Sequence, residues 1–438
     1  MKRDHRIPFS TLKPENWRNL ALMAVAAFYI GFFAMTVKQG GFPKAYGIDS
    51  FAFWSVGRIA DEKGYSEIYD VENLKASQIN VLNSLDQQQS TQNSSFAPIP
   101  VPFLPLFVVP FQLLSRLDPK LSYWIWTVIN LLVMLAYLIF LSRRLQKKIH
   151  SKVPNTPQTI MMLLYFPVFA NFINGQVNVF LLVCIGEFLR NVMEDHPFTA
   201  GLWLGGLLLK PQVLILIVPV LLILRYWKIF AGFFTSSAVI LLTSLALSGW
   251  NGMKALVGLW TKYSAGMATN APENMINWRM VGVNLNYLFD TQWGWLIAGF
   301  GMAATLLGVI LLVKRMPPYG SPGWIVAILG VFCATLAVTW HAHYHMAMVI
   351  IPLLLFALAQ QWVSRKLVFY WVVVTPLAMF LMMIVSLVGQ QTAGVDLLQF
   401  EGYVFGSTGF IMNLVLFISI IRNRNRLSLP VTDNSSTQ

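Results

Sequence analysis

Asp49 is the first residue in the chain whose type and position suggest chemistry. It follows the first long apolar run and opens a mostly polar loop, in which an amphipathic helix is expected over residues 51–62. A carboxylate held at the mouth of a membrane bundle can accept a proton from a substrate hydroxyl, as a general base does. A second interpretation is that Asp49 or Ser50 simply caps the helix that follows.

Lys210 is the second such residue, because it interrupts apolar sequence. Together with Pro211 it separates two apolar runs, residues 198–209 and 213–224, each too short to cross about 30 Å of hydrocarbon comfortably. We therefore expect this turn to lie below the outer membrane surface, in a cavity. A lysine there needs a partner or water, and a phosphate would pair with it. The alternative is a lysine that extends along apolar surface to reach the interface.

Half of the six histidines lie in one short segment, Trp340-His341-Ala342-His343-Tyr344-His345. Their imidazoles can donate hydrogen bonds to a phosphate or to sugar hydroxyls. On a helix, His341 and His345 would share a face and could bind a metal, although the sequence offers no evident third ligand. Interfacial histidines that merely cap helix ends are a further interpretation.

Two other polar turns are candidates for binding. Arg279 can hold a phosphate through two parallel hydrogen bonds, and Trp278 can stack on a sugar ring. Both residue types are also ordinary anchors at a membrane interface. The turn Asn174-Gly175-Gln176-Val177-Asn178 separates two apolar runs. In its plainest interpretation Gly175 ends one helix and Asn178 caps the next.

The composition identifies the class of protein that must position these groups. Of 438 residues 56% are hydrophobic and only 11% charged, and apolar runs of membrane-spanning length recur, so the chain is a polytopic membrane protein. Cys184 and Cys333 both lie in apolar runs and are expected to be core residues. A glycine loop that could cradle phosphates is missing, which argues against an ATP or nucleotide-sugar site.

The net charge of +13 reflects membrane orientation rather than nucleic-acid binding, because the cations cluster in short connections beside apolar runs. If these connections are cytoplasmic, an even number of crossings separates neighbouring clusters. Contacts with anionic lipids would be a further consequence of the same charges. The clusters are Arg143, Arg144, Lys147, Lys148 and Lys152; Arg225 and Lys228; Lys314 and Arg315; Arg365 and Lys366; and Arg422, Arg424 and Arg426.

We therefore predict an all-α fold with about 12 transmembrane or near-spanning helices. Five prolines between residues 98 and 110 interrupt the segment 101–114, which we expect to lie in the outer interface rather than to span. Residues 1–19 and 422–438 form cytoplasmic tails. Residues 38–120 form a large first outer loop, in which juxtamembrane helices are expected over 51–62 and 71–85.

Five short motifs, in order along the chain, resemble glycosyltransferase family 87. The resemblance rests on Asp49-Ser50-Phe51 through Trp54, Gly57-Arg58 and Tyr65; on the proline-rich stretch 98–110; on Gly175-Gln176-Val177-Asn178; on Lys210-Pro211; and on Trp340 to Tyr344. In the last motif His341 replaces an acid and Ala342 a histidine of the family pattern. His343 is the position that matches.

The resemblance implies a GT-C fold, with residues 20–421 as one transmembrane catalytic domain, and an inverting transfer of a hexose, typically mannose, from a polyprenyl-phosphate sugar to a glycolipid or glycan hydroxyl. No cofactor or metal is implied. Asp49 would be the general base, and the donor phosphate would be held by Lys210, His343, Arg279 and His341. Sugar contacts would come from Trp54, Arg58, Tyr65, Gln176, Asn178, Trp278 and Trp340.

The same resemblance implies a prokaryotic plasma membrane with the site on its outer face, and the distribution of the basic residues predicts that both termini are cytoplasmic. The substrates and membrane lipids would be its partners, and no nucleic acid is expected. Two rival functions remain open. A transporter or flippase of lipid-linked glycans would use the basic and histidine groups to bind head groups without chemistry. A membrane-bound ligase or acyltransferase would use a histidine near His343 and leave Asp49 dispensable.

Overall fold

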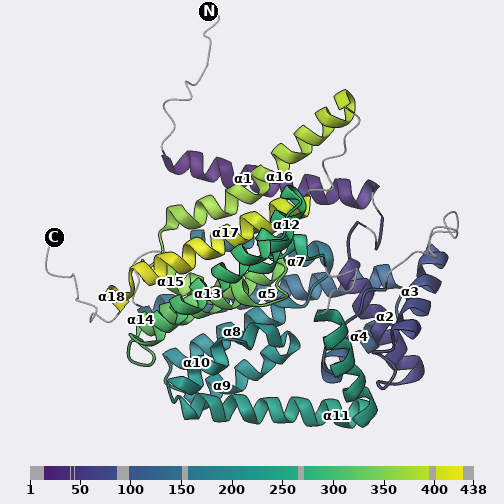
Figure 1. Cartoon of the computed structure of the whole chain (residues 1–438), viewed down its shortest axis with the longest axis horizontal. Helices are drawn as coiled ribbons and strands as arrows, with labels where there is room; N and C mark the ends of the chain where they lie inside the picture. Colours follow the sequence, from purple (N-terminus) through teal and green to yellow (C-terminus); the bar gives the residue numbers. More distant parts are fainter. Residues whose placement is uncertain are drawn as a thin grey trace, which may run out of the picture.

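Helices make up almost all of the described chain (Figure 1). The computed structural model describes residues 14–39, 41–43, 45–85, 98–149, 156–264, 271–393 and 401–427. Within these ranges the only extended pairing is one antiparallel bridge between Met275 and His343. The predicted all-α class is confirmed.

The helices follow one another in the order below, with 3₁₀ segments labelled η. They are α1 (Pro14–Gln39), α2 (Ile48–Lys63), α3 (Val71–Leu85), η3 (Pro105–Val108), α4 (Val109–Leu114), α5 (Pro119–Ile149), α6 (Thr156–Leu163), α7 (Phe166–Asn174), α8 (Asn178–Met193), α9 (Pro197–Gly205), η4 (Gly206–Leu209), η5 (Pro211–Leu214), α10 (Ile217–Ile223), α11 (Trp227–Ser264), η7 (Pro272–Asn274), α12 (Trp278–Phe289), α13 (Trp293–Val313), α14 (Pro322–Val338), η8 (Tyr344–Ile350), α15 (Ile351–Ala359), α16 (Arg365–Ala393), α17 (Glu401–Arg422) and α18 (Arg424–Leu427).

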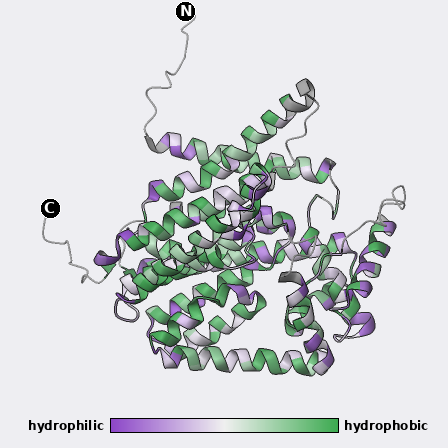
Figure 2. Cartoon of the chain, viewed as in Figure 1, coloured by the Kyte–Doolittle hydropathy of each residue, from purple (hydrophilic) through white to green (hydrophobic). Residues whose placement is uncertain are grey.

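Six helices of the described chain, α1, α5, α11, α13, α16 and α17, are long and apolar enough to cross a membrane. The ribbons of these helices are coloured largely as hydrophobic in Figure 2. Five further apolar segments have only 10–17 residues: Pro105–Leu114, Pro197–Leu209, Pro211–Ile223, Pro322–Val338 and Tyr344–Ala359. The chain is thus an integral membrane protein, but the predicted count of about 12 spans is not confirmed, because several expected spans are these short segments.

Prolines explain why several expected spans are broken into shorter helices. The apolar segment 160–172 consists of the separate helices α6 and α7, and Pro167 stands in the first turn of α7. Pro211 likewise begins η5, and Pro352 lies in the first turn of α15. Proline fixes its own backbone and lacks a donor, so each break leaves backbone groups that need partners inside the protein. Such breaks are where polar side chains can gather in a membrane bundle.

Helix α11 is too long to be a single crossing. Its 38 residues would extend about 57 Å against a hydrocarbon core of about 30 Å. Gly249 divides it, with φ 64° and ψ −179°, and the axis turns sharply there (Figure 1). The first part packs tightly on α9, since a Cβ at Gly201 would lie 1.9 Å from the carbonyl oxygen of Ile229. Small residues at this contact let the two backbones approach, as is common between membrane helices.

The centre of the bundle is α14, in which every residue from Gly323 to Ala337 is buried. A helix that is apolar on all sides belongs in a core, and other helices surround this one. Cys333 lies within it, and Cys184 is buried in α8; neither forms a disulfide, as predicted. The turn that carries the three clustered histidines follows α14 directly.

The stretch 38–120, predicted to be the first outer loop, contains the two predicted helices, as α2 and α3. The proline-rich segment forms the short helices η3 and α4 instead of a span, as expected. Helix α4 packs on α2 through the rings of Phe53 and Phe111, whose centroids are 4.9 Å apart, and through a 2.6 Å hydrogen bond from the Tyr65 hydroxyl to Gln112 Oε1. These contacts fix the position of α2, and with it Asp49.

Candidate functional site

Asp49 lies in the first turn of α2 and does not cap it. The N-cap is Gly47, with φ 73°, and no side chain caps the helix, so the capping interpretation of Asp49 and Ser50 is wrong. The backbone N–H of Gly47 donates to the carbonyl oxygen of Ile173, 2.7 Å away. The start of α2 is thereby attached to the end of α7, and the half-buried Asp49 carboxylate lies beside the turn between α7 and α8.

Gly175 shapes that turn. It ends α7 in the left-handed conformation, with φ 70°, as the sequence predicted, and its N–H donates back to the carbonyl oxygen of Phe172 over 3.1 Å. Its own carbonyl oxygen accepts a hydrogen bond from the indole of Trp126 in α5. A Cβ at Gly175 would lie 2.5 Å from the Cβ of Ser50, so the turn fits against α2 only because this residue has no side chain.

Replacing Gly175 by alanine is expected to destabilise the protein by roughly 1–3 kcal/mol, because positive φ and the clash with Ser50 act together. The measurement is the thermal unfolding midpoint of the purified protein in detergent. Gly31→Ala is the matched control, since a Cβ there meets nothing within 4 Å. Equal midpoints for the two variants would contradict the packing described for this turn.

Lys210 occupies the break between η4 and η5, where its backbone leaves the helical region with φ −134° and ψ 79°. The side chain is only 7% exposed. Its Nζ donates to Oε1 of Gln176 at 2.8 Å and to Oδ1 of Asn178 at 2.9 Å. The lysine is therefore held inside the bundle, and the interpretation that it extends to the membrane interface is wrong.

Gln176 joins Lys210 to Asp49. Its carbonyl oxygen accepts from the lysine, and its side chain also forms a hydrogen bond with the Asp49 carboxylate. Dense protein around Asp49 raises the pKa of this carboxyl above its usual value, although the side chain retains some solvent contact; the Gln176 hydrogen bond and the charge of Lys210 act in the opposite direction. Asp49 is thus a stronger base than an exposed aspartate, and it lies within electrostatic range of the buried ammonium.

Gln176→Leu should move the acidic limb of any Asp49-dependent activity to higher pH. The Gln176 hydrogen bond stabilises the ionised carboxylate, so its loss raises the pKa of Asp49 further. A general base works in its ionised form, and activity falls as the pH drops through its pKa. The measurement is the pH profile of kcat/KM. If the acidic limb of the profile lay at the same pH in Gln176→Leu and in the wild type, and the two proteins had the same thermal stability, Gln176 would not affect the pKa of Asp49.

Asn178 takes a different role from the one predicted for it. Helix α8 begins at this residue with Val177 as its N-cap and without a side-chain cap, so the capping interpretation is wrong. While its Oδ1 accepts from Lys210, its Nδ2 donates to the carbonyl oxygen of His345 at 3.3 Å. The backbone N–H of Asn178 donates in turn to Oδ1 of the buried Asn171. Asn178 therefore links the lysine to the histidine turn.

The histidine segment is an extended turn followed by the 3₁₀ segment η8, not an α-helix. His343 pairs with Met275 in the antiparallel bridge, and the N–H of Ile276 donates to the carbonyl oxygen of Ala342 at 2.8 Å. The helical spacing on which a metal site at His341 and His345 depended is absent. Across the described ranges, no three His, Cys, Asp or Glu side chains are grouped so that they could hold a metal ion. His343 is the N-cap residue of η8, but its side chain makes no capping hydrogen bond.

His343 lies between the other two histidines, with ring centroids 4.7 Å from His341 and 5.7 Å from His345. Burial, followed by the positive charges of Lys210 and Arg279, lowers the pKa of His343 to about 4. The imidazole is therefore neutral near pH 7, and it can donate one hydrogen bond and accept another. Its effect on an anion would come from hydrogen bonding rather than from a positive charge.

Arg279 lies in the first turn of α12, where the side chain of Asn277 caps the helix by accepting from the N–H of Met280. The guanidinium carbon is 4.7 Å from the centroid of the Trp340 ring, and Nη1 donates to the Trp340 carbonyl oxygen at 3.3 Å. This pair connects α12 to the histidine turn. Trp340 is 44% exposed and keeps ring surface open for a substrate.

Trp278 points elsewhere. Its indole N–H donates to the Thr305 hydroxyl at 2.9 Å, and its ring packs edge-on against Phe410. A Cβ added at Gly301 would lie 2.3 Å from the same ring. These contacts give Trp278 a packing role between α12, α13 and α17, which does not favour the predicted stacking on a sugar.

The predicted sugar-binding residues between positions 54 and 65 all form hydrogen bonds or ion pairs with other residues of the stretch 38–120. The buried Trp54 donates from its indole N–H to the carbonyl oxygen of Leu117 at 3.0 Å. The exposed Arg58 pairs with Glu62, and Tyr65 bonds to Gln112. None of these contacts joins the Asp49–Lys210 group, so a sugar-binding role for these residues remains a prediction.

The structure therefore brings together Asp49, Gln176, Asn178, Lys210 and the histidine turn with Arg279. Asn171, which supports Asn178, was not anticipated. Its signal in the sequence is a polar residue inside the apolar run before Gly175. A carboxylate, a buried cation and neutral hydrogen-bond donors at one site are suited to moving a proton from a hydroxyl while an anion is stabilised.

The family model of glycosyltransferase family 87 matches residues 101–339, more than half of the chain. The chain belongs to glycosyltransferase family 87. Comparisons with curated proteins and with solved structures found no match. The family 87 match contains Gln176, Asn178, Lys210 and Arg279. Asp49 and the histidine turn lie outside it, and only their contacts in the fold connect them to the matched region.

Proposed function

We propose that this glycosyltransferase has a GT-C fold and transfers a hexose, mannose, from a polyprenyl-phosphate donor to a hydroxyl of a glycolipid or glycan at the outer membrane face. One observation carries the proposal: Gln176 bridges a carboxylate, Asp49, and a buried ammonium, Lys210. A single displacement at an anomeric carbon requires a base for the incoming hydroxyl and a stabilised leaving group. The bridge supports both requirements in one site.

The charge around Lys210 favours a phosphate ligand. Both of its hydrogen-bond acceptors are neutral amide oxygens, and these use two of its three donors. Within the part of the chain that the structure describes, Asp49 is the carboxylate whose charge acts on it. A buried ammonium with a free donor and little compensating charge is suited to an anionic substrate group.

The reaction is a single displacement at the anomeric carbon. The acceptor oxygen attacks the anomeric carbon while Asp49 takes its proton, and the bond between that carbon and the phosphate oxygen breaks with inversion. The electron pair of the broken bond goes to the phosphate. Lys210 stabilises that charge as an ammonium, Arg279 as a guanidinium and His343 as a neutral hydrogen-bond donor.

The positions of the basic residues support an outer-face site. Helix α5 begins near the site, where Trp126 contacts Gly175, and ends with Lys147 and Lys148. Helix α8 likewise begins at Asn178 and has Arg190 in its last turn. Cations at helix ends indicate the cytoplasmic side, so the opposite ends of α5 and α8, which contact the turn at Gly175 and Lys210, would face outward.

The test is sugar transfer by the purified protein, offered polyprenyl-phosphate mannose and polyprenyl-phosphate glucose with a panel of glycolipid acceptors. A product that contains the transferred sugar, with inverted anomeric configuration, supports the proposal. Movement of the lipid-linked sugar across proteoliposomes without a product would favour the transporter or flippase. Acyl transfer that needs His343 but not Asp49 would favour the acyltransferase. Retention of configuration would rule out the single displacement.

A further inference from the structure

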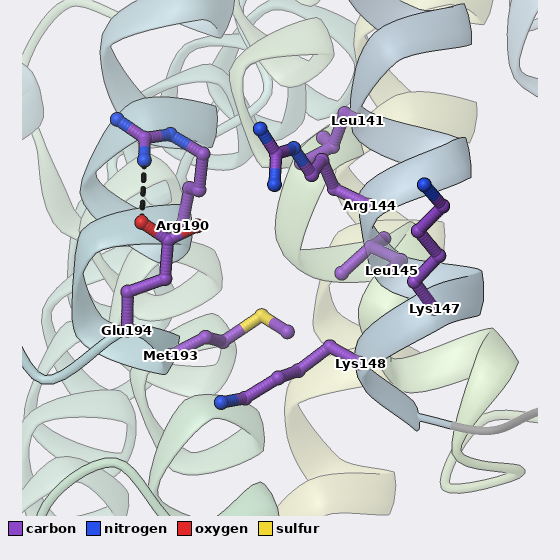
Figure 3. Close-up of a pocket in the computed structure, with 8 residues that line it drawn as sticks. All are labelled: Leu141, Arg144, Leu145, Lys147, Lys148, Arg190, Met193 and Glu194. Atoms are coloured by element: carbon purple, nitrogen blue, oxygen red, sulfur yellow. Dashed lines mark hydrogen bonds and ion pairs between the residues drawn. The ribbon is translucent and has the colours of Figure 1, made fainter.

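A cavity of about 220 Å³ lies between the last turns of α5 and α8 (Figure 3). It is far larger than the roughly 10–15 Å³ that a single water requires. Trp126 and Asn178, at the opposite ends of these helices, belong to the sugar-transfer site or contact it. About 12 residues of helix separate Asn178 from Arg190, or roughly 18 Å at 1.5 Å per residue. The cavity is therefore separate from that site.

The cavity carries excess positive charge. Arg190 contributes no excess positive charge, because it donates to two carboxylates, Glu187 at 2.7 Å and Glu194 at 2.6 Å, which together outweigh its single charge. Arg144, Lys147 and Lys148 also line the cavity, and no carboxylate among the described residues pairs with them. In Figure 3 Arg144 and Lys148 extend from α5 toward α8, on either side of Met193. Two uncompensated cations thus line the space between the helices, which favours an anionic group there.

The surface beside the cavity is apolar and exposed. Along α5, which is long and apolar enough to cross a membrane, Phe140 is 39% exposed, Ile139 48% and Leu132 61%. The Arg144 guanidinium carbon is 5.5 Å from the centroid of the Phe140 ring, so the cationic group adjoins this apolar stripe directly. A ligand that matches both features has an anionic head and hydrocarbon chains. A soluble phosphate would match the cavity alone.

We propose that this cavity binds the phosphate of an anionic membrane lipid, with its acyl chains along the exposed face of α5. Basic pockets between membrane helices on the cytoplasmic side are suited to such head groups. The site would lie on the membrane face opposite sugar transfer. The proposal does not depend on the sugar-transfer reaction, because its readout is lipid binding.

The test is native mass spectrometry of the full-length protein titrated with dioleoylphosphatidylglycerol, with dioleoylphosphatidylcholine and, separately, with inorganic phosphate. The double variant Arg144→Gln/Lys148→Gln should bind the first lipid roughly tenfold more weakly than the wild type, because two unpaired cations that line the cavity are lost. Arg143→Gln/Lys366→Gln is the matched control, since it removes one arginine and one lysine from exposed positions outside the cavity. This control should bind like the wild type.

Preferential retention of phosphatidylglycerol that is lost in the cavity variant and kept in the control supports the proposal. Equal weakening in both double variants would overturn it, because general surface charge would then explain the binding. Equal retention of the two lipids by the wild type would also overturn it. Inorganic phosphate that displaces phosphatidylglycerol at comparable concentration would assign the cavity to a soluble anion and reject the lipid.

Discussion

Asp49→Asn is expected to reduce sugar transfer by about 10²–10⁴-fold, the usual contribution of a general base. Asparagine has nearly the same shape and can still bond to Gln176, but it cannot accept the proton of the acceptor hydroxyl. The loss should therefore appear in kcat rather than in donor binding. The measurement is initial-rate kinetics with polyprenyl-phosphate mannose at fixed acceptor, together with the thermal unfolding midpoint of each protein.

Asp61→Asn is the matched control for this prediction. Asp61 lies on the same helix, α2, but its carboxylate pairs with Arg116 at 2.9 Å on the loop surface. We expect this variant to retain the activity of the wild type, because an exposed ion pair contributes little. If Asp49→Asn kept full activity, Asp49 would not be the base, and the proposed single displacement would lose its proton acceptor.

Lys210→Gln is expected to lower kcat by about 10²–10³-fold, the loss typical of removing one preorganised group that stabilises developing charge. Glutamine can still bond to the amides of Gln176 and Asn178, but it offers no positive charge to a departing phosphate. Lys210→Arg should retain part of the activity, because the charge remains while the planar guanidinium fits the two acceptors differently. The kinetics are measured as for Asp49.

Lys254→Gln provides the control for lost charge. This exposed lysine lies on α11 beyond the bend at Gly249, and its ammonium is over the ring of Trp250. None of its described contacts is with a residue of the site. Its removal should leave kcat unchanged. Unchanged kinetics in Lys210→Gln, with the donor still bound at the same KM, would show that the buried ammonium does not serve the leaving group.

Much of the helical structure was predictable because it depends on local sequence. The helix over residues 71–85 has the predicted limits, since an amphipathic pattern sets them. The breaks were less predictable. At Gly249 the small and polar residues Ser248, Asn251 and Gly252 end the apolar run, but neither composition nor periodicity shows that the helix resumes after a bend and continues to Ser264.

The sequence by itself determined which residue types could do chemistry. A lysine inside apolar sequence, an aspartate after the first span and three clustered histidines are recognisable because charged and polar groups in a membrane bundle are costly and few. What they contact was decided by the tertiary structure. Gln176 and Lys210 are 34 residues apart, and Asn178 and His345 are 167 apart.

These partners meet only because proline and glycine breaks bring several helix ends to one place. The same packing turned Trp278 into a core contact and made Gln176, expected to bind sugar, a bridge between Asp49 and Lys210. The sequence alone gives the type of each residue, but its hydrogen-bond partners depend on which turns meet when the helices pack. For this reason the sequence identified the candidate groups, and only the fold could assign their pairing.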